Sequence, residues 1–476
     1  MRLAYTADMR ADTRLIAGIV AGAFFMQLLD STIINTSLPQ MAATFGVTPL
    51  GVSIGITIYL MSAAAFMPLS GWLADRFGAR NVFTGAIVLF TLASLCCGLA
   101  GNLPQFGLAR ALQGVGGALM TPVGRMVVLR STQKSELLQA IALITWPALA
   151  APIVAPALGG FITTYISWRW NFLLNVPLGI AGAALAARFV PNATAAAQAD
   201  LDWRGFALAA LALTALLYGL QSLSQARVDA LLSGALILIG AALGALAVRH
   251  FAHTPHPLLQ LSSARVHTYA ASSLTSGTAF RIAITATPFL LPLLFQLIFG
   301  LSALASGALL LVYFVGNMGI KPFTTPILRR LGFRSVLVGN GALAGLAIAA
   351  CATFTAATPH VLMMAVLLVA GMTRSMQFTG LNSLSFADIS AEQRSSAATL
   401  SSVIEQVAAV LGVAFAAIML NLGQMLGGEN VVSLRDFQVA FLAAGMLGLA
   451  AAMSFRRLNA NAGTEVSGHR AHRAMR

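Results

Sequence analysis

The stretch Gly71-Trp72-Leu73-Ala74-Asp75-Arg76-Phe77-Gly78-Ala79-Arg80 lies between two long apolar runs of the chain. One acid and two arginines fall between Asp75 and Arg80, and Gly78 allows a sharp turn there. Charged side chains are costly in hydrocarbon, so a charged turn between two apolar runs belongs at a water boundary of a membrane. The two arginines favour the cytoplasmic boundary, because cytoplasmic loops carry an excess of basic residues.

The composition predicts an all-α integral membrane protein. The chain has 476 residues, of which 58% are hydrophobic and 9% are charged, whereas a soluble protein carries about a quarter charged residues. The formal charge of +14 is spread over many loops without a basic stripe, which indicates membrane topology and argues against a nucleic-acid partner. Cys96, Cys97 and Cys351 lie in apolar runs without the spacing of a disulfide framework or a metal site.

The chain holds no Gly-Lys-Ser/Thr phosphate loop, because neither of its lysines, Lys134 and Lys321, follows a glycine. This excludes ATP binding by that motif, and no zinc spacing or nucleophile elbow is present. We therefore expect a protein without a cofactor or metal that is not an enzyme. Any pumping must then draw on an ion gradient or on a separate subunit.

About fourteen segments are long and apolar enough to span a bilayer, which requires ~20 apolar residues each. With both termini in the cytoplasm, the cytoplasmic segments hold 22 of the 28 Lys and Arg residues and the outer loops hold three. This asymmetry favours that orientation, with the protein in the inner (plasma) membrane. The predicted spans lie near residues 15–37, 50–72, 81–101, 104–125, 138–164, 170–190, 204–224, 230–249, 270–298, 303–325, 333–354, 360–385, 398–420 and 436–455.

A weak internal repeat suggests two related halves. Residues 73–80 align with residues 327–334, and Arg110-Ala-Leu-Gln113 aligns with Arg374-Ser-Met-Gln377. Many transporters are built from such repeats, with the substrate path at the repeat interface. The predicted organisation is a cytoplasmic N-terminus (1–14), a six-helix bundle (15–190), a linker (191–203), an extra two-helix hairpin (204–249), a cytoplasmic loop (250–269), a second six-helix bundle (270–455) and a basic cytoplasmic tail (456–476).

Five ionisable residues fall inside predicted spans, where such groups are candidates for function: Asp30, Arg110, Arg281, Arg374 and Glu405. A rise of ~1.5 Å per residue places Asp30 and Arg110 at similar depths in the outer third of the membrane. The same rise places Glu405 and Arg374 each roughly 10 Å from the cytoplasmic face, with Arg281 near mid-depth. The five side chains are thus expected to form one or two buried clusters.

A buried acid beside an arginine has the minimal chemistry of proton coupling. Burial favours its neutral form and the arginine its ionised form, so a change in water access or in the distance to the arginine makes it bind or release a proton. A cationic drug could compete for the same carboxylate. The alternative interpretation is a static salt bridge between helices.

Several polar side chains in apolar spans could line an amphiphilic cavity, although helix packing is the alternative for each of them. These candidates are Gln27, Gln113, Trp146, Gln296, Gln377 and Asn382.

Five motifs carry a resemblance to a known family. Residues 71–80 resemble the signature loop of the major facilitator superfamily. Residues 29–39, Leu-Asp-Ser-Thr-Ile-Ile-Asn-Thr-Ser-Leu-Pro, resemble the first-span signature of its fourteen-span drug:proton antiporters, the EmrB/QacA group. Residues 110–118 resemble the fourth-span motif of that group, and Arg281 with residues 288–292 resembles its ninth span. Residues 156–160 resemble the end of its fifth-span antiporter motif, although alanine stands at positions 142, 151 and 155 where glycine is usual.

The resemblance implies the major facilitator fold, with two six-helix bundles around a midplane cavity and two extra central helices. It implies proton-coupled export of amphiphilic, cationic or lipophilic compounds, with Asp30 as the proton or cation carboxylate and Arg110 as its modulator. It also implies a gating loop, formed by Gly71, Asp75, Arg76, Gly78 and Arg80.

Two alternative functions remain open. One is a proton symporter that imports a small nutrient or organic acid, which the altered fifth-span motif allows. The other is a non-transporting membrane sensor. The expected partners are a small-molecule substrate, protons and the lipid bilayer; we expect a monomer, with an accessory periplasmic protein as an open possibility.

Overall fold

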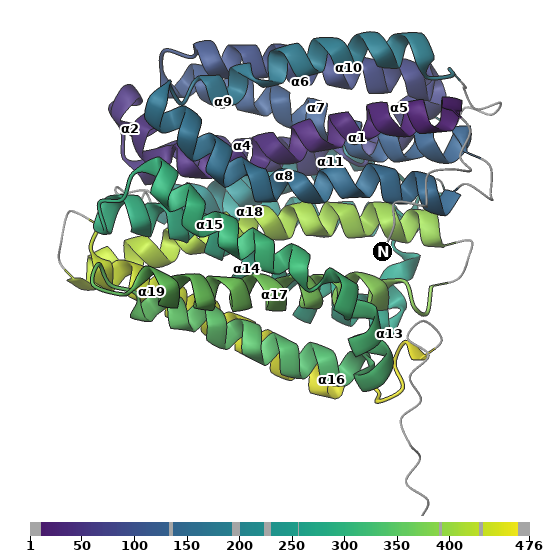
Figure 1. Cartoon of the computed structure of the whole chain (residues 1–476). Helices are drawn as coiled ribbons and strands as arrows, with labels where there is room; N and C mark the ends of the chain where they lie inside the picture. Colours follow the sequence, from purple (N-terminus) through teal and green to yellow (C-terminus); the bar gives the residue numbers. More distant parts are fainter. Residues whose placement is uncertain are drawn as a thin grey trace, which may run out of the picture. The chain divides into compact units, whose positions relative to one another are not determined.

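The computed structural model describes residues 11–132, 137–192, 200–222, 230–255, 257–389, 393–427 and 432–464. Within these ranges the regular structure consists of helices, and no strand is present. The chain divides into two compact units, residues 1–214 and residues 215–476. Figure 1 shows the helices of both units along the chain.

Unit 1 is built from long apolar helices joined by short ones. Its helices are α1 (Ala11–Ile33), α2 (Leu38–Phe45), α3 (Pro49–Val52), α4 (Ile54–Phe66), α5 (Leu69–Phe77), α6 (Ala79–Leu99), α7 (Leu103–Ser131), α8 (Leu137–Tyr165), α9 (Trp170–Leu173), α10 (Asn175–Phe189) and the first part of α11 (Trp203–Ser222). Helix α7 packs against α4 and α6, while α1 packs against α8, α10 and α7. The side chain of Asn102 caps α7 by accepting a hydrogen bond from the backbone N–H of Gln105.

Two glycines let α7 approach its neighbours closely. A Cβ atom on Gly114 would lie 2.3 Å from the carbonyl oxygen of Tyr59 in α4, and one on Gly116 would lie 2.8 Å from the backbone nitrogen of Phe90 in α6. Small residues permit this backbone-to-backbone packing in membrane helices. The close approach brings the polar side chains of α7 to the centre of unit 1.

Unit 2 holds the remaining helices. They are α12 (Ala230–His253), α13 (His267–Tyr269), α14 (Ser276–Leu293), α15 (Ala303–Gly319), α16 (Lys321–Ala350), α17 (His360–Ser385), α18 (Arg394–Gly427) and α19 (Leu434–Ser454). Short π-helical turns at Ala270–Leu274 and Leu294–Ile298 flank α14. Helix α17 packs against α15 and α16, and α14 packs against α18 and α19.

The sharp turn predicted at Gly78 is present, because this residue joins α5 to α6 with a φ angle of 87°. Gly332, its counterpart in the sequence repeat, has a φ angle of 75° at a kink inside α16. Positive φ angles of this kind are strained for residues that carry a Cβ atom. The two aligned stretches therefore share a backbone turn as well as a sequence pattern.

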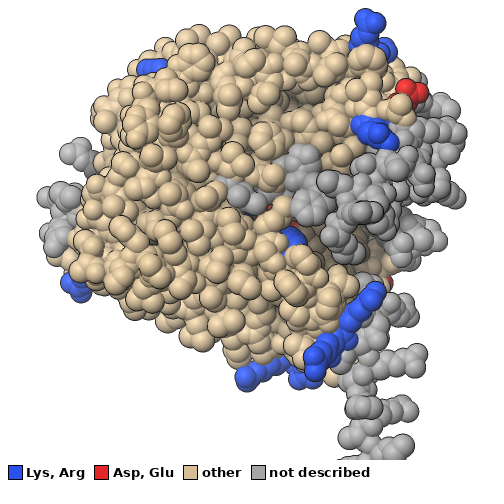
Figure 2. Space-filling model, viewed as in Figure 1, with Lys and Arg blue, Asp and Glu red and all other residues tan. Residues whose placement is uncertain are grey.

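Eleven helical stretches in the described part of the chain are long and apolar enough to cross a membrane, and α15 is a shorter apolar helix. The stretch that contains α1 is 67% buried over its most apolar window, whereas those of α11 and α12 are only 22% and 17% buried. Exposed apolar helices of this kind suit a hydrocarbon solvent. Figure 2 shows that few charged side chains interrupt the face in view.

Candidate functional site

A buried ion pair lies at the centre of unit 1. The Nη1 atom of Arg110 in α7 lies 2.8 Å from the Oδ2 atom of Asp30 in α1. Both residues have a relative exposure of 0%. Two of the predicted site residues, 80 positions apart in the chain, are thus brought into direct contact.

Two amides complete the surroundings of the carboxylate. Gln113 and Asn175 each donate a hydrogen bond of 2.8 Å to the Oδ1 atom of Asp30. Gln113 also donates to the hydroxyl of Ser94 at 2.7 Å. Helices α1, α6, α7 and α10 all contribute to this network, and its members are fully buried. We call these five residues, Asp30, Ser94, Arg110, Gln113 and Asn175, the Asp30 network.

The guanidinium of Arg110 is fixed by hydrogen bonds and by an aromatic ring. Its Nη1 atom also donates to the Oε1 atom of Gln113, three positions along the same helix. Its Nε atom donates to the carbonyl oxygen of Gly55 at 3.2 Å, and its central carbon lies 4.3 Å from the ring centre of Tyr59. A cation above an aromatic face is attracted by the quadrupole of the ring.

Arg110 thus compensates the negative charge of a carboxylate that is out of contact with water. Removing one partner of such a buried pair leaves an uncompensated charge and costs about 3–5 kcal/mol. Asn175 contains a further polar atom of interest, because its buried Oδ1 atom has no hydrogen-bond partner. The network can therefore hold a carboxylate, and it also has an acceptor available if that carboxylate becomes protonated.

A second ion pair lies in unit 2 and is more open. The Nη2 atom of Arg281 in α14 lies 3.2 Å from the Oε1 atom of Glu405 in α18 and 2.8 Å from the Oδ1 atom of Asn382 in α17. Its Nη1 atom donates to the carbonyl oxygen of Ser272 at 2.7 Å. The side chain of Glu405 is 36% exposed, so solvent screens this pair more than the pair in unit 1.

Arg374, the fifth predicted ionisable residue, lies outside both ion pairs. Its guanidinium carbon is 5.6 Å from the ring centre of Tyr313, 5.8 Å from that of Phe314 and 6.0 Å from that of Phe378. Its Nε atom is buried without a hydrogen-bond partner. Within the described residues, the predicted clusters are therefore two ion pairs and one arginine enclosed by aromatic rings.

The predicted cavity residues have several different environments. Gln27 donates to the carbonyl oxygen of Gly117 at 3.1 Å and accepts from Thr121 at 2.8 Å, which links α1 to α7. Gln377 is fully buried and donates to the carbonyl oxygen of Leu337, which links α17 to α16. Gln113 belongs to the Asp30 network, and Asn382 accepts a hydrogen bond from Arg281. Gln296 is half-buried in the π-helical turn after α14. The side chain of Trp146 lies outside the described residues.

The predicted gating residues follow the end of α5 and the start of α6. Asp75 and Arg80 are half-buried, Arg76 is exposed, and Gly78 forms the turn between the helices. A Cβ atom on Gly71 would meet no other atom within 4 Å, so this glycine is not required by packing in this structure.

Sequence reasoning missed Ser94 and Asn175. It selected ionisable residues inside spans and passed over single uncharged polar residues in apolar runs. Asn175 had one usable signal, because an amide at that place in an apolar helix requires a hydrogen-bond partner.

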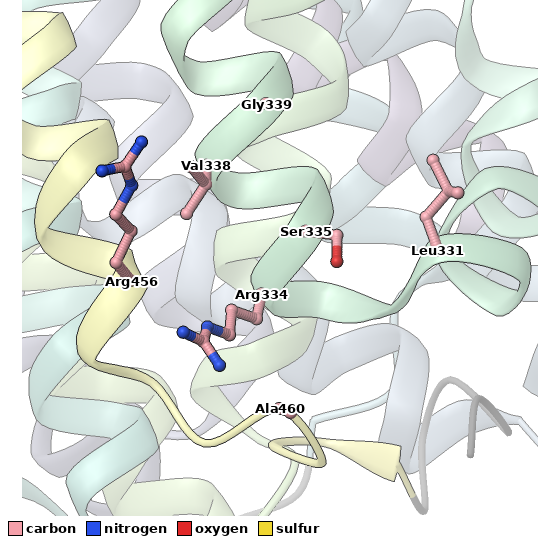
Figure 3. A pocket seen from close by; sticks show the side chains of 7 residues that line it. All are labelled: Leu331, Arg334, Ser335, Val338, Gly339, Arg456 and Ala460. Atoms are coloured by element: carbon pink, nitrogen blue, oxygen red, sulfur yellow. The ribbon is translucent and has the colours of Figure 1, made fainter. Parts of the chain in front are cut away.

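A separate cavity of about 370 Å³ lies beside the kink of α16 and the end of α19. Figure 3 shows Arg334 and Arg456 on its wall, and Ser335 and Val338 belong to its lining. None of the predicted transport residues lines this cavity.

A family model described as Major Facilitator Superfamily matches residues 20–413 and 277–474. The chain belongs to the major facilitator superfamily. It is 35% identical over 450 residues to a protein of Citrobacter koseri that bears the provisional name multidrug resistance protein MdtD, covering 94% of this chain and 95% of that protein. It is 37% identical over 417 residues to a protein of the same name from Escherichia coli O6:H1, covering 87% of this chain and 88% of that protein.

Solved structures share the fold of this family. A peptide transporter of the POT family has a TM-score of 0.69 at 15% identity, covering 94% of this chain and 97% of that one. A D-xylose-proton symporter has a TM-score of 0.67 at 14% identity, covering 95% and 98%. The predicted major facilitator fold is confirmed, and the chain is a multi-pass membrane transporter.

Proposed function

We propose that this chain is a secondary active transporter that exports amphiphilic drugs or toxic compounds in exchange for protons. The observation that carries the proposal is the fully buried Asp30–Arg110 pair, 2.8 Å apart, inside helices otherwise suited to hydrocarbon. Intramembrane ionisable residues are costly and mark proton or ion pathways. The names of the relatives from Citrobacter koseri and Escherichia coli support a drug-like substrate.

The proposed coupling step is a change in the protonation of Asp30. In the state described here, Arg110, Gln113 and Asn175 stabilise its ionised form by three hydrogen bonds. A conformation that separates Arg110 from the carboxylate, or admits water to it, favours proton uptake. The protonated acid can then donate to Asn175, because rotation of this amide presents its unpaired Oδ1 atom to Asp30.

We assign the second ion pair, Arg281 with Glu405, a supporting role in coupling. Its partial exposure gives water access to Glu405 while Arg281 stays bound to Asn382. For the loop from Gly71 to Arg80 we propose gating, supported by the turn at Gly78.

We also propose fourteen spans. The eleven apolar stretches together with α7, α8 and α15 would give this number. Helices α7 and α8 have 29 residues each, enough to span a bilayer at a tilt, and α15 has 17 residues, the lower end of the length that a span requires. The proposed topology has both termini in the cytoplasm, with six-span bundles at 15–190 and 270–455 and an extra hairpin at 204–249. A monomer in the inner membrane is the simplest assembly.

The test uses inside-out membrane vesicles with an imposed pH gradient and fluorescent amphiphilic compounds. Wild-type protein is expected to move the compound into the vesicle lumen as protons leave. D30N and R110A are expected to abolish this movement while the protein still inserts in normal amount. Full proton-driven transport by both variants would refute the coupling site. Movement of the compound in the same direction as the protons would instead indicate a symporter.

A further inference from the structure

The spans of unit 2 hold more positive than negative charge. Glu405 compensates Arg281, but neither Arg374 nor Lys321 forms an ion pair anywhere in the described part of the chain. Lys321 is the first residue of an apolar span, and both side chains are half-buried. Uncompensated charges in such surroundings are unfavourable unless a function requires them.

Arg374 is bound by groups that carry no negative charge. The ring centres of Tyr313, Phe314 and Phe378 lie 5.6–6.0 Å from the guanidinium carbon. The Nε atom remains buried and unbonded. Aromatic contacts attract a cation but do not neutralise it, and the unbonded Nε–H of Arg374 can still donate to an anion.

Lys321 lies near the aromatic residues that surround Arg374. Its Nζ atom donates to the hydroxyl of Thr379 at 3.0 Å, and Thr379 follows Phe378, which contacts Arg374. Five positions separate Arg374 from Thr379 on α17, a rise of about 7.5 Å. Lys321 and Arg374 thus both reach the same part of α17, and two like charges close together raise each other's cost. A bound anion would offset both charges at once.

Unit 1 shows how the same arrangement is neutralised in the other half of the repeat. Arg110 lies 4.3 Å from the ring centre of Tyr59, as Arg374 lies 5.6 Å from that of Tyr313. Gly114, four residues after Arg110, packs against the carbonyl of Tyr59, and Gly371, three residues before Arg374, packs against that of Tyr313. In unit 1 the arginine has a carboxylate partner from α1, whereas the described residues of unit 2 supply no carboxylate to the corresponding arginine.

We propose that Arg374 and Lys321 bind the carboxylate or sulfonate of an amphiphilic organic anion, and that Phe314 and Phe378 contact its apolar part. This inference rests on the proposed function and deepens it, because it names a substrate class for the transporter. The negative charge that unit 1 contains as a side chain would be brought to unit 2 by the transported compound.

The experiment measures binding to the purified full-length protein in detergent micelles by equilibrium dialysis, without a pH gradient. The probes are 1-naphthoate and its neutral analogue 1-naphthylmethanol. The variants are R374Q, R374K and K321Q, and the matched control is R435Q, which removes an exposed arginine at the start of α19. Empty micelles correct for partitioning of the probes.

We expect naphthoate to bind R374Q at least about tenfold more weakly than wild type, the loss expected for one charge-assisted hydrogen bond. Naphthylmethanol should bind wild type and R374Q with equal affinity. R374K should still prefer naphthoate to naphthylmethanol, and K321Q should lose part of this preference. R435Q should bind both probes as wild type does. Equal affinity of the wild type for both probes, an equal loss of both in R374Q, or the same loss in R435Q would overturn the proposal. Binding without proton-driven flux would refute only the proposed function, and flux without anion preference would refute only this inference.

Discussion

Replacing each member of the Asp30–Arg110 pair in turn gives an asymmetric result that the structure predicts. In R110Q the carboxylate keeps its two amide donors but loses its cation. In D30N the guanidinium keeps the carbonyl of Gly55, the side chain of Gln113 and the ring of Tyr59, but loses its anion. Each change leaves one buried charge uncompensated, for which the cost is about 3–5 kcal/mol.

The losses of stability in R110Q and D30N depend differently on pH. The isolated carboxylate of R110Q can escape its cost by binding a proton, whereas an arginine does not lose its proton in a protein. The folded R110Q protein then binds more protons than the unfolded chain, so its stability falls as the pH rises. We expect R110Q to be nearly as stable as wild type at pH 5 and clearly less stable at pH 8, and D30N to be destabilised by a similar amount at both values.

The measurement is unfolding in mixed micelles with increasing dodecyl sulfate, for wild type, D30N, R110Q and the double variant at both pH values. The double variant removes both charges, so its loss should be smaller than the sum of the single losses by about 1–3 kcal/mol. Additive losses to within about 0.5 kcal/mol would show that the pair is not energetically coupled. A pH-independent loss in R110Q would refute the argument that its carboxylate is neutralised.

Three further predictions concern packing, the second ion pair and the pH profile. G114A should destabilise unit 1 and reduce transport, because the new Cβ atom would lie 2.3 Å from the Tyr59 carbonyl oxygen. The control G85A places a Cβ atom with no other atom within 4 Å, so its melting temperature and flux should be unchanged. Equal effects of the two substitutions would contradict this account of α7 packing. E405Q should lower unfolding free energy by no more than about 1 kcal/mol, because its pair is partly solvent-screened; a loss as large as that of D30N would indicate a site much drier than its 36% exposure. N175A should change the pH profile of efflux in vesicles, because Asp30 loses one of its three hydrogen-bond donors; an unchanged profile would contradict the coupling role of this amide.

The general architecture of this protein could be predicted from composition and motifs. Long apolar runs have few stable alternatives to helices in a membrane, because each backbone donor and acceptor needs a partner within the segment. The turn at Gly78 was also predictable, because a glycine in a short charged link permits the positive φ angle observed there. The candidate ionisable residues followed from the cost of charge in hydrocarbon, which makes every buried charge conspicuous in the sequence.

The pairing of those residues was only partly predictable. The helical rise placed Asp30 and Arg110 at similar depths, but depth alone does not fix the direction of a side chain around its helix axis. Glu405 and Arg374 were also placed at similar depths, yet the structure pairs Glu405 with Arg281. Asn175 was missed because an uncharged amide in an apolar run does not indicate which group it will bind.

The sequence alone therefore determined that the protein lies in a membrane, that it is helical, and which buried charges need an explanation. These properties depend on the free energy of moving each side chain from water to hydrocarbon and on local backbone chemistry. Only the tertiary structure decided which charges are compensated, because that depends on the close approach of helices distant in sequence. Glycines such as Gly114 set this approach at the level of individual atoms. The same packing left Arg374 among aromatic rings, with no carboxylate partner among the residues that the structure describes, an outcome that no local pattern around it could reveal.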